Sequence, residues 1–326
     1  MTCVLVTGGS GFIGQHLVAT LVASGRQTRV LDLRPPGRAV TNAQYVKGSV
    51  LDRELVDQAL DGVDEVYHLA GLPGMWVAHK DDFHAVNCRG TEVVISAARE
   101  RGVTRFLHCS TESILFRSSP AGGDVEDTLL TADDMPGPYT RSKLLAERLA
   151  MEAAASGFPV VIGSPTMPIG PHDHNLTPPT AMLRHFLGKR FQFYLDFVLN
   201  LVDVRDVAAG LILVMERGKV GSRYILGGES IPLKKLLEYV AAISGRESLR
   251  IPVPGRLAEV TAAILEFMAD HVTRTPPSAT AEAVRIALRS TALSTERAQR
   301  ELGYAPRPIE SALRETITYL ADTHAA

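Results

Sequence analysis

Tyr139 and Lys143 lie four positions apart in the segment Tyr-Thr-Arg-Ser-Lys, so a helix here would place a phenol and an ammonium on one face. A free tyrosine has a pKa of about 10, which suits proton transfer poorly at neutral pH. Neighbouring positive charges stabilise tyrosinate, and we therefore expect Lys143 together with a positively charged nicotinamide ring to lower the pKa of Tyr139. The pair would then exchange a proton with an oxygen whose carbon gains or loses hydride. A surface pair without a chemical role is the alternative.

Thr111 and Asn87 are expected to complete this proton-transfer group. Thr111 follows a hydrophobic run predicted as a strand, and open parallel sheets bind ligands at the carboxyl ends of their strands. We predict that its hydroxyl orients the substrate oxygen, although a hydroxyl at this place also suits a turn. Asn87 lies in a long predicted helix over 81–101. It either holds a water or a carbonyl in a relay to Lys143, or it caps or kinks that helix.

A glycine-rich turn, Thr-Gly-Gly-Ser-Gly-Phe-Ile-Gly, follows the first predicted strand. Gly8, Gly11 and Gly14 would allow a tight turn, close approach of a pyrophosphate and close packing of helix against strand. Phe12 and Ile13 begin the next predicted helix, whose N-terminus directs backbone N–H groups and a positive dipole end at an anion. The turn therefore predicts a dinucleotide site, with a purely structural turn as the alternative.

Asp32 ends the second predicted strand, eighteen residues after Gly14. A carboxylate there can accept hydrogen bonds from the ribose hydroxyls and would repel a 2′-phosphate, which favours NAD. Because Arg34 could bind a 2′-phosphate, NADP remains an alternative cofactor. The alternative interpretation of Asp32 is a solvated aspartate at a strand end without a ligand. Further residues are expected near the cofactor from their positions after later strands: Ser49, Val50, Leu69, Ala70, Gly71 and Pro165, together with Tyr139 and Lys143.

Short β-branched runs alternate with helical segments from residue 3 to about residue 163. The predicted strands cover 3–7, 28–33, 44–47, 65–68, 105–109 and 159–163. The predicted helices cover 12–24, 53–60, 81–101 and 139–155. This β-α-β alternation predicts an α/β fold, a Rossmann-type doubly wound parallel sheet with helices on both faces.

The second half of the chain is richer in proline and in helical segments, at 233–244, 257–271 and 309–321. We expect residues 1–170 to form the NAD(P)-binding domain, with 200–227 contributing to it. Residues 171–326 would form a smaller, mostly helical substrate lobe.

The charge is balanced, with 34 Lys and Arg against 36 Asp and Glu, so we expect no nucleic-acid partner. Three widely spaced cysteines fit neither a disulfide framework nor a clustered metal site. The N-terminal segment lacks the pattern of a signal peptide, and no apolar run reaches the ~20 residues of a membrane span. We therefore expect a soluble, cytoplasmic protein that acts on a small molecule.

Taken together, these motifs resemble the extended short-chain dehydrogenase/reductase superfamily, and within it the NAD-dependent epimerase/dehydratase family. Three later segments also look like this family: Asn-Leu-Val-Asp-Val-Arg-Asp-Val-Ala from residue 200, Tyr-Ile-Leu-Gly-Gly from residue 224 and Glu-Leu-Gly-Tyr-Ala-Pro from residue 301. The resemblance implies catalysis by Thr111, Tyr139, Lys143 and Asn87. It also implies a homodimer through helices 81–101 and 139–155, with Val93, Val94, Ala97, Leu145 and Leu149 as its apolar contacts.

The segment Ser-Pro-Thr-Met-Pro-Ile-Gly-Pro from residue 164 resembles dihydroflavonol reductases and 3β-hydroxysteroid dehydrogenases more than nucleotide-sugar enzymes. Hopanoid-associated proteins named as sugar epimerases share its Pro-Ile-Gly-Pro end. Glu112 is followed by Ser113, whereas sugar-nucleotide dehydratases have an Asp-Glu pair here, which argues against elimination. The substrate residues expected from this comparison and from their positions are Leu72, Trp76, Glu112, Thr166 and Met167.

Three other groups of side chains have two interpretations each. Phe191, Phe193, Tyr194 and Phe197 suit either an apolar substrate pocket or the core. Leu257, Val260, Ile264, Phe267 and Met268 form a helical stripe, which is either core or a membrane-facing flap. His172 and His174 lack a third nearby ligand, and we expect no metal there.

Three functions therefore remain open. The first is an NAD-dependent oxidoreductase that moves hydride between nicotinamide and a secondary alcohol or ketone of a ring-containing or lipophilic substrate. The second is a nucleotide-sugar epimerase that retains its NAD. The third is a regulator that senses dinucleotide without catalysis, which the Tyr139 and Lys143 pair disfavours.

Overall fold

The computed structural model describes residues 2–116, 125–128, 130–187, 191–245 and 248–324. Seven parallel strands form the central sheet in the order β10-β6-β5-β4-β1-β2-β3. The strands are β1 (Cys3–Thr7), β2 (Gln27–Asp32), β3 (Ala43–Lys47), β4 (Glu65–His68), β5 (Arg105–Cys109), β6 (Val160–Pro165) and β10 (Arg223–Leu226). Their central residues are apolar and almost fully buried because helices cover both faces. The predicted doubly wound sheet is confirmed.

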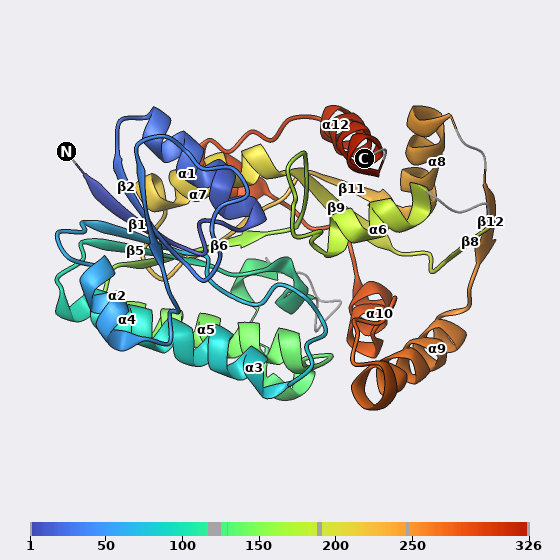
Figure 1. Ribbon diagram of the computed structural model, residues 1–326, viewed down its shortest axis with the longest axis horizontal. Coiled ribbons are helices and arrows are strands. Elements are labelled where there is room, and N and C mark those ends of the chain that lie inside the picture. Colours follow the sequence, from blue (N-terminus) through green and yellow to red (C-terminus); the bar gives the residue numbers. More distant parts are fainter. Residues whose placement is uncertain (1, 117–124, 129, 188–190, 246–247, 325–326) are drawn as a thin grey trace.

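Helices lie on both faces of this sheet (Figure 1). One face carries α1 (Phe12–Ala23), α7 (Val204–Arg217) and α11 (Glu296–Leu302), which share one apolar core with the sheet. The other face carries α2 (Arg53–Ala59), α4 (Gly90–Glu100) and α5 (Pro138–Ala155) over a second core. The two cores hold the sheet rigid beneath its carboxyl edge.

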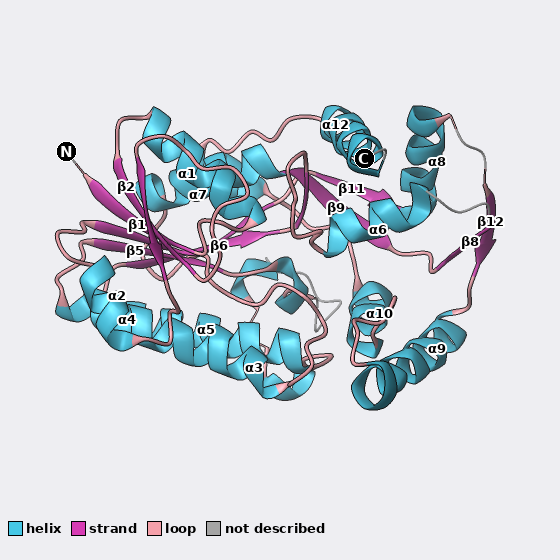
Figure 2. Ribbon diagram, in the orientation of Figure 1, coloured by secondary structure: helices cyan, strands magenta, loops and turns pink. Residues whose placement is uncertain are grey.

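The remaining elements form a lobe beside the carboxyl edge of the sheet (Figure 2). Its strands are β7 (Met167–Ile169), β9 (Val198–Asp203) and β11 (Glu229–Pro232) in one small sheet, and β8 (Phe191–Tyr194) with β12 (Leu249–Pro252) in another. Its helices are α6 (Pro178–Leu187), α8 (Leu233–Ser244), α9 (Gly255–Met268), α10 (Ala281–Arg289) and α12 (Ile309–His324). A third apolar core joins α6, α8, α12 and β9.

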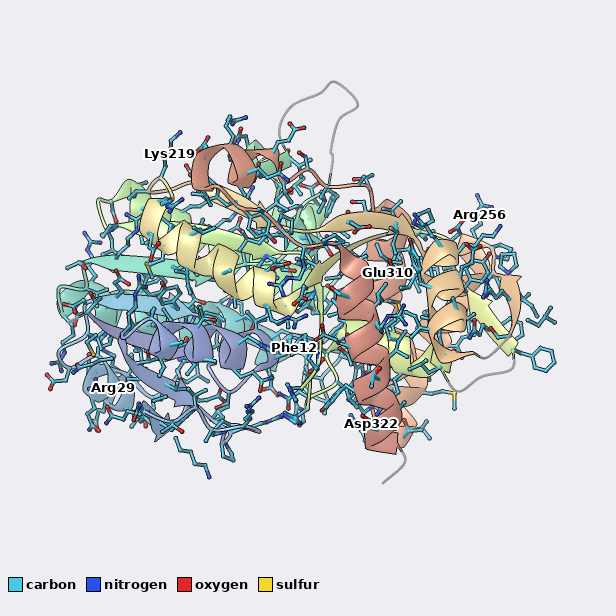
Figure 3. The ribbon with its side chains drawn as sticks, turned by 90° about the horizontal axis from the view of Figure 1, so that it is seen from above. Phe12, Arg29, Lys219, Arg256, Glu310 and Asp322 are labelled. Carbon is cyan, nitrogen blue, oxygen red and sulfur yellow. The ribbon has the colours of Figure 1, made fainter. Side chains whose placement is uncertain are left out.

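The connections between strands set the position of the ligand site. The chain runs from β1 to β2 and β3 on one side, and then crosses back to β4, β5 and β6 on the other. The order therefore reverses between β1 and β4, and ligands of such sheets bind at that reversal. Figure 3 shows Phe12, at the start of α1, lying between the sheet and the lobe helix that carries Glu310 and Asp322.

One prediction about a helix is wrong in part. The single helix predicted over 81–101 is divided into α3 (Asp81–Phe83), a π-helical segment (His84–Arg89) and α4. The side chain of Asn87, within the π-helical segment, binds Leu72 and Ser142, which lie on two other segments. The lobe is mostly helical, as predicted, and it also contains five short strands whose sequences carry little periodic signal. None of the described helices is long and apolar enough to cross a bilayer.

Candidate functional site

The glycine-rich turn is built for close approach of an anion. Gly8 has φ +72°, and a Cβ there would lie 2.6 Å from the backbone nitrogen of Ala70. A Cβ on Gly14 would clash with the carbonyl oxygen of Gly8, so neither position accepts a larger residue. Gly11 caps α1 without a side-chain hydrogen bond, which leaves the N–H groups of the first turn for a ligand. This cradle fits the pyrophosphate of a dinucleotide.

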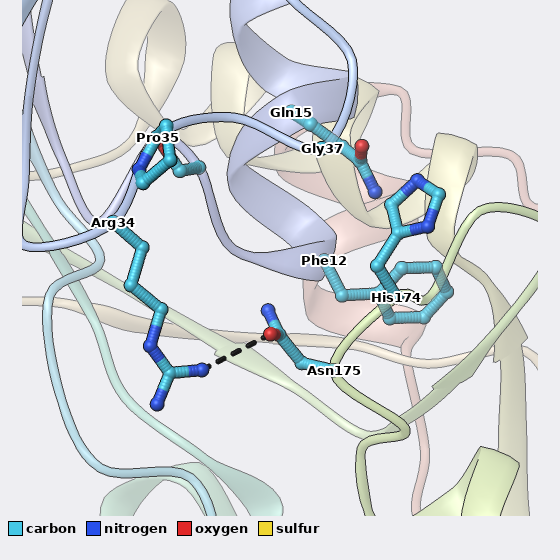
Figure 4. A pocket seen from close by; sticks show the side chains of 8 residues that line it. Phe12, Gln15, Arg34, Pro35, Gly37, His174 and Asn175 are labelled. Atoms are coloured by element: carbon cyan, nitrogen blue, oxygen red, sulfur yellow. Dashed lines mark hydrogen bonds between the residues drawn. The ribbon is translucent and has the colours of Figure 1, made fainter.

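Asp32 lies directly beside the cradle. One of its carboxylate oxygens accepts a hydrogen bond from the Ser10 backbone N–H (3.0 Å), and the other accepts one from the Arg34 backbone N–H (3.0 Å). The Arg34 guanidinium donates to Oδ1 of Asn175 in the lobe (3.1 Å), as Figure 4 shows. A pocket at this place is lined by Ser10, Phe12, Gln15, Arg34, Pro35, Gly37, His174 and Asn175. The carboxylate at the strand end, where NAD-binding sheets contact ribose, fits NAD.

The other residues predicted for the cofactor lie at or just beyond the carboxyl ends of β3, β4 and β6. The backbone N–H groups of Leu69 and Ala70 bond to Thr7 of β1 (3.0 and 3.3 Å). Gly71 faces the Asn87 amide, where a Cβ would come within 2.9 Å of Oδ1. Ser49 accepts a hydrogen bond from Leu51, Val50 is part of the second core, and Pro165 ends β6.

Thr111 and Tyr139 meet at the carboxyl end of β5. Their hydroxyl groups share a hydrogen bond, and the Tyr139 side chain is only 6% exposed. The Tyr139 ring packs edge-on against Phe83, with ring centroids 5.9 Å apart. Lys143 lies one turn further along α5, and its Nζ donates to the carbonyl oxygen of Cys109 (2.9 Å). Three of the predicted catalytic residues are therefore together at one edge of the sheet.

Burial dominates the protonation of this group within the chain itself. Burial raises the pKa of Tyr139 to about 12, and the nearby carboxylates of Glu282 and Glu112 act in the same direction. The hydrogen bond from Thr111 works against this rise. Burial also lowers the pKa of Lys143. Within the chain itself the pKa of Tyr139 is therefore raised, and the lowering predicted from Lys143 and a nicotinamide ring stays a prediction for the cofactor-bound site.

Asn87 occupies a buried hydrogen-bond network. Its Oδ1 accepts from the Leu72 backbone N–H (2.8 Å), and its Nδ2 donates to Oγ of Ser142 (2.8 Å). Ser142 in turn donates to the carbonyl oxygen of Tyr139 (2.7 Å). These contacts connect the loop after β4 to α5, and no hydrogen bond between the side chains of Asn87 and Lys143 occurs within the described part of the chain.

Glu112 is a buried carboxyl group next to Thr111. Burial raises its pKa to about 8, and a hydrogen bond with Asn200 of β9 works against this rise. Its Oε2 has no partner among the described residues, and the same is true of the buried hydroxyls of Ser110, Ser164 and Thr166. Sequence reasoning did not single out Ser110 or Ser164 for the ligand site. Such unpartnered polar atoms suit a ligand that brings its own polar groups.

Glu282 was missed by sequence reasoning altogether. It lies at the start of α10 in the lobe and is 3% exposed. Its Oε2 accepts from the Tyr139 backbone N–H (3.1 Å), and its Oε1 accepts from the backbone N–H and the hydroxyl of Thr140 (2.7 Å each). Burial raises the pKa of Glu282. No local signal could have found it, because more than 140 residues separate it from the helix it caps.

The predicted substrate residues are divided between the sheet edge and the lobe. Leu72 follows β4, while Thr166 and Met167 lie at the junction of β6 and β7. Trp76 donates from Nε1 to the carboxylate of Asp270 (2.7 Å), and the ammonium of Lys80 lies 5.3 Å from its ring centroid. The loop after β4 is thereby attached to the segment that follows α9.

The structure decides several open alternatives. Phe191 and Phe193 are exposed, so they do not belong to the core, whereas Tyr194 and Phe197 belong to the third core. The side chains of the α9 stripe are exposed, and the core interpretation of that stripe is wrong. The ring centroids of His172 and His174 lie 6.2 Å apart. Among the residues described, no three or more His, Cys, Asp or Glu side chains are grouped as a metal site would require.

Two of the five expected dimer contacts are unavailable. Val94 and Ala97 are completely buried in the second core of their own chain, because the inner face of α4 packs on the sheet. Val93, Leu145 and Leu149 are partly buried and remain candidates.

Comparison with known proteins places these features in a family. The family model described as "NAD dependent epimerase/dehydratase family" matches residues 4–227. The chain is 31% identical to a putative dihydroflavonol 4-reductase from Synechocystis over 97% of this chain and 93% of that protein. It is 31% identical to the 4-hydroxy-2-methyl-3-oxo-4-farnesyl-3,4-dihydroquinoline-1-oxide ketoreductase of Stigmatella aurantiaca, over 93% of this chain and 91% of that protein.

A solved structure is similar over almost the full length. MoeE5 in complex with UDP-glucuronic acid and NAD superimposes with a TM-score of 0.77 at 25% identity, covering 98% of this chain and 99% of that chain. The family model spans the glycine cradle, Thr111, Tyr139 and Lys143. The chain belongs to the NAD-dependent epimerase/dehydratase family.

Proposed function

We propose that this protein is an NAD-dependent oxidoreductase that moves hydride between nicotinamide and a secondary alcohol or ketone. One observation carries this proposal: the hydrogen-bonded hydroxyls of Thr111 and Tyr139 lie at the sheet edge that also holds the glycine cradle. A proton donor fixed beside a dinucleotide site is what carbonyl reduction requires. A regulator that only senses dinucleotide has no use for such a donor.

The residues of the cradle would hold the cofactor. The first turn of α1 would bind the pyrophosphate, and Asp32 would accept the hydroxyls of the adenosine ribose. Lys143 would bind the hydroxyls of the nicotinamide ribose, since its ammonium lies within one turn of Tyr139 on α5. Bound NAD would supply the carbon that accepts or returns the hydride.

Proton transfer is assigned to Tyr139. A phenol with a pKa of about 12 is protonated at neutral pH, so it is ready to donate to the oxygen of a carbonyl that is being reduced. Thr111 would hydrogen-bond the same oxygen and orient it. Asn87 acts as a positioning residue, because its amide connects the loop after β4 to the first turns of α5.

We assign the substrate to the space between the sheet edge and the lobe. Leu72, Trp76, Thr166 and Met167 offer apolar surface, and Glu112 offers one carboxyl group that is largely neutral at pH 7. This lining suits a ring-containing or lipophilic ketone better than a diphosphate. The names of the two relatives, a dihydroflavonol reductase and a quinoline ketoreductase, support this substrate class.

A nucleotide-sugar epimerase that retains NAD is the second candidate. It is favoured by one observation, the similarity to a structure that binds UDP-glucuronic acid and NAD. Both functions would use Tyr139 for proton transfer. In the oxidoreductase the cofactor ends in a changed redox state, whereas in the epimerase the hydride returns to the sugar.

The test uses the purified protein with NAD or NADP, each in its oxidised form for alcohols and in its reduced form for ketones. A panel of a 3β-hydroxysteroid, a dihydroflavonol, a hopanoid alcohol and UDP-glucose is offered, with Tyr139→Phe as control. An oxidoreductase changes the absorbance of the nicotinamide as substrate is consumed. An epimerase converts the sugar without net change in the cofactor, and that outcome would replace the first function by the second.

We also propose the organisation in which this reaction takes place. Residues 1–170, with 200–227, would bind the cofactor, and the rest of 171–326 would bind the substrate. Val93, Leu145 and Leu149, partly buried in the single chain, would meet a second copy in a homodimer. Three free cysteines suit the reducing cytoplasm. A monomeric sedimentation profile at micromolar concentration would contradict the dimer.

A further inference from the structure

Helix α9 exposes its apolar face to solvent. The side chains of this face run along the helix and into the π-helical turn after it (Ala269–Thr273), and each is between 44% and 68% exposed. They are Leu257, Val260, Ile264, Phe267, Met268 and Val272. At ~1.5 Å per residue this face is ~22 Å long. Contiguous apolar surface of this kind marks an interaction site.

The acidic residues of α9 and of the turn after it bond to neighbouring segments of the chain. Glu259 pairs with Arg285 of α10 (2.6 Å), and Glu266 pairs with Lys80 (3.3 Å) and accepts from the Ala281 backbone N–H (3.0 Å). Asp270 pairs with Lys80 and accepts from the Trp76 indole. An ordinary surface helix buries its apolar side chains. This helix instead exposes its apolar side chains, while its acidic side chains bond to neighbouring segments.

A second exposed apolar surface lies at the same end of the molecule. Phe191 and Phe193 occupy one face of β8, and Leu249 of β12 pairs beside Phe191. Strand β12 is joined to α9 by Val253 and Pro254, and Figure 1 shows both at the end opposite to the N-terminus. The two surfaces therefore lie at the same end of the molecule, away from the cofactor cradle.

The charges beside this apolar face are positive. Arg256 stands at its start, at the outer end of the molecule in Figure 3, and Arg274 follows its last turn. Both are exposed, and neither has an acidic partner within 4.0 Å among the described residues. A second copy packed antiparallel on this face would bring the arginines of both copies together, which disfavours a dimer here. An anionic surface would instead attract both ends.

We propose that α9, together with β8 and β12, docks the protein on the surface of an anionic lipid bilayer. The apolar side chains would enter the boundary between headgroups and acyl chains, and Arg256 and Arg274 would contact lipid phosphates. The helix lies on the bilayer and does not cross it. The docked lobe carries Glu282 and Asp270, whose side chains bond to Tyr139 of α5 and to Trp76 of the loop after β4. This docking does not depend on the proposed reaction.

The experiment is co-sedimentation of the full chain with vesicles of phosphatidylcholine alone or with phosphatidylglycerol added. We expect binding to the anionic vesicles, weakened by salt, and about fivefold weaker binding when either Arg256 or Arg274 is changed to Gln. The double variant Ile264→Glu/Phe267→Glu should lose at least about tenfold of its affinity, since charge is placed in the apolar face. The control is Val220→Glu, an equally exposed apolar side chain (49%) in the turn before β10.

Circular dichroism and NAD binding would show that each variant is folded. The changed side chains at Arg256, Ile264, Phe267 and Arg274 are all exposed and lie far from the glycine cradle. Absence of sedimentation with either vesicle would overturn the proposal, as would equal binding by the double variant. The natural chain could also form a dimer and fail to bind vesicles, with the double variant monomeric. That result would assign this face to a second copy and would overturn the proposal.

Discussion

Glu282 of α10 accepts a hydrogen bond from the backbone N–H of Tyr139, so the lobe itself caps the helix that carries the proton donor. The first N–H groups of a helix have no partner within it, and a carboxylate there satisfies them and matches the helix dipole. The position of the phenol therefore depends on the docking of the lobe. In the proposed reaction, proton transfer and substrate binding would be coupled through this one side chain.

Replacement of Glu282 by Gln should impair both stability and catalysis. The amide keeps the size of the side chain but loses the charge and offers one acceptor oxygen instead of two. We expect the free energy of unfolding to fall by about 1–3 kcal/mol, measured by urea denaturation, together with a lower kcat. Glu296→Gln, an exposed position in the first turn of α11, is the control. Equal unfolding midpoints for the two variants would contradict the capping role.

Glu112 predicts a dependence of stability on pH. Its pKa is about 8 in the folded chain against an ordinary 4.5, so the folded state holds this proton more tightly than the unfolded state does. Its contribution to stability is complete below the ordinary value and is lost as pH rises toward about 8. Glu112→Gln does not titrate, and it should gain in melting temperature relative to the natural chain between about pH 5 and about pH 9.

The matched control for this titration is Glu310→Gln, since Glu310 is exposed at the start of α12. A difference in melting temperature that stays constant with pH for Glu112→Gln would show that this carboxyl has an ordinary pKa.

Removal of the Tyr139 hydroxyl should strongly lower kcat and spare cofactor binding. General acid–base catalysis contributes about 10²–10⁴-fold, and Tyr139→Phe should lose that factor in kcat while its ring still packs on Phe83. The measurement is steady-state kinetics beside an NAD titration. Tyr239→Phe, in α8, should keep full activity. Comparable turnover in both variants would remove Tyr139 from the reaction.

The glycine cradle is tested by Gly8→Ala against Gly25→Ala. Both glycines have positive φ, so alanine strains the backbone similarly at the two places. Only at Gly8 does a Cβ meet neighbouring backbone, whereas Gly25 has open space. We expect calorimetric titration to show NAD affinity about tenfold weaker or worse for Gly8→Ala, a cost of at least about 1.4 kcal/mol, and no change for Gly25→Ala.

The sequence predicted the sheet well because its signals are local. Strands β1, β4 and β5 begin and end at the predicted residues, since each is a short apolar run bounded by turn residues. The cradle and the Tyr139–Lys143 spacing were visible for the same reason. Glu282 and the rise that burial causes in the pKa of Tyr139 were not, because both arise when distant segments bury the site. The short strands β7, β8, β11 and β12 gave no periodic signal, and tertiary packing decides them.

The most direct test of the proposed reaction follows a deuterium atom. A ring alcohol of the panel, such as the 3β-hydroxysteroid, is labelled on the carbon that bears the hydroxyl and incubated with the protein and NAD. The account predicts deuterated NADH in equal amount to the ketone, formed by the natural chain and not by Tyr139→Phe. Equal formation of deuterated NADH by Tyr139→Phe would contradict the account. A second contradicting result is that the protein inverts a carbon of UDP-glucose without net change in the cofactor and oxidises none of the ring alcohols.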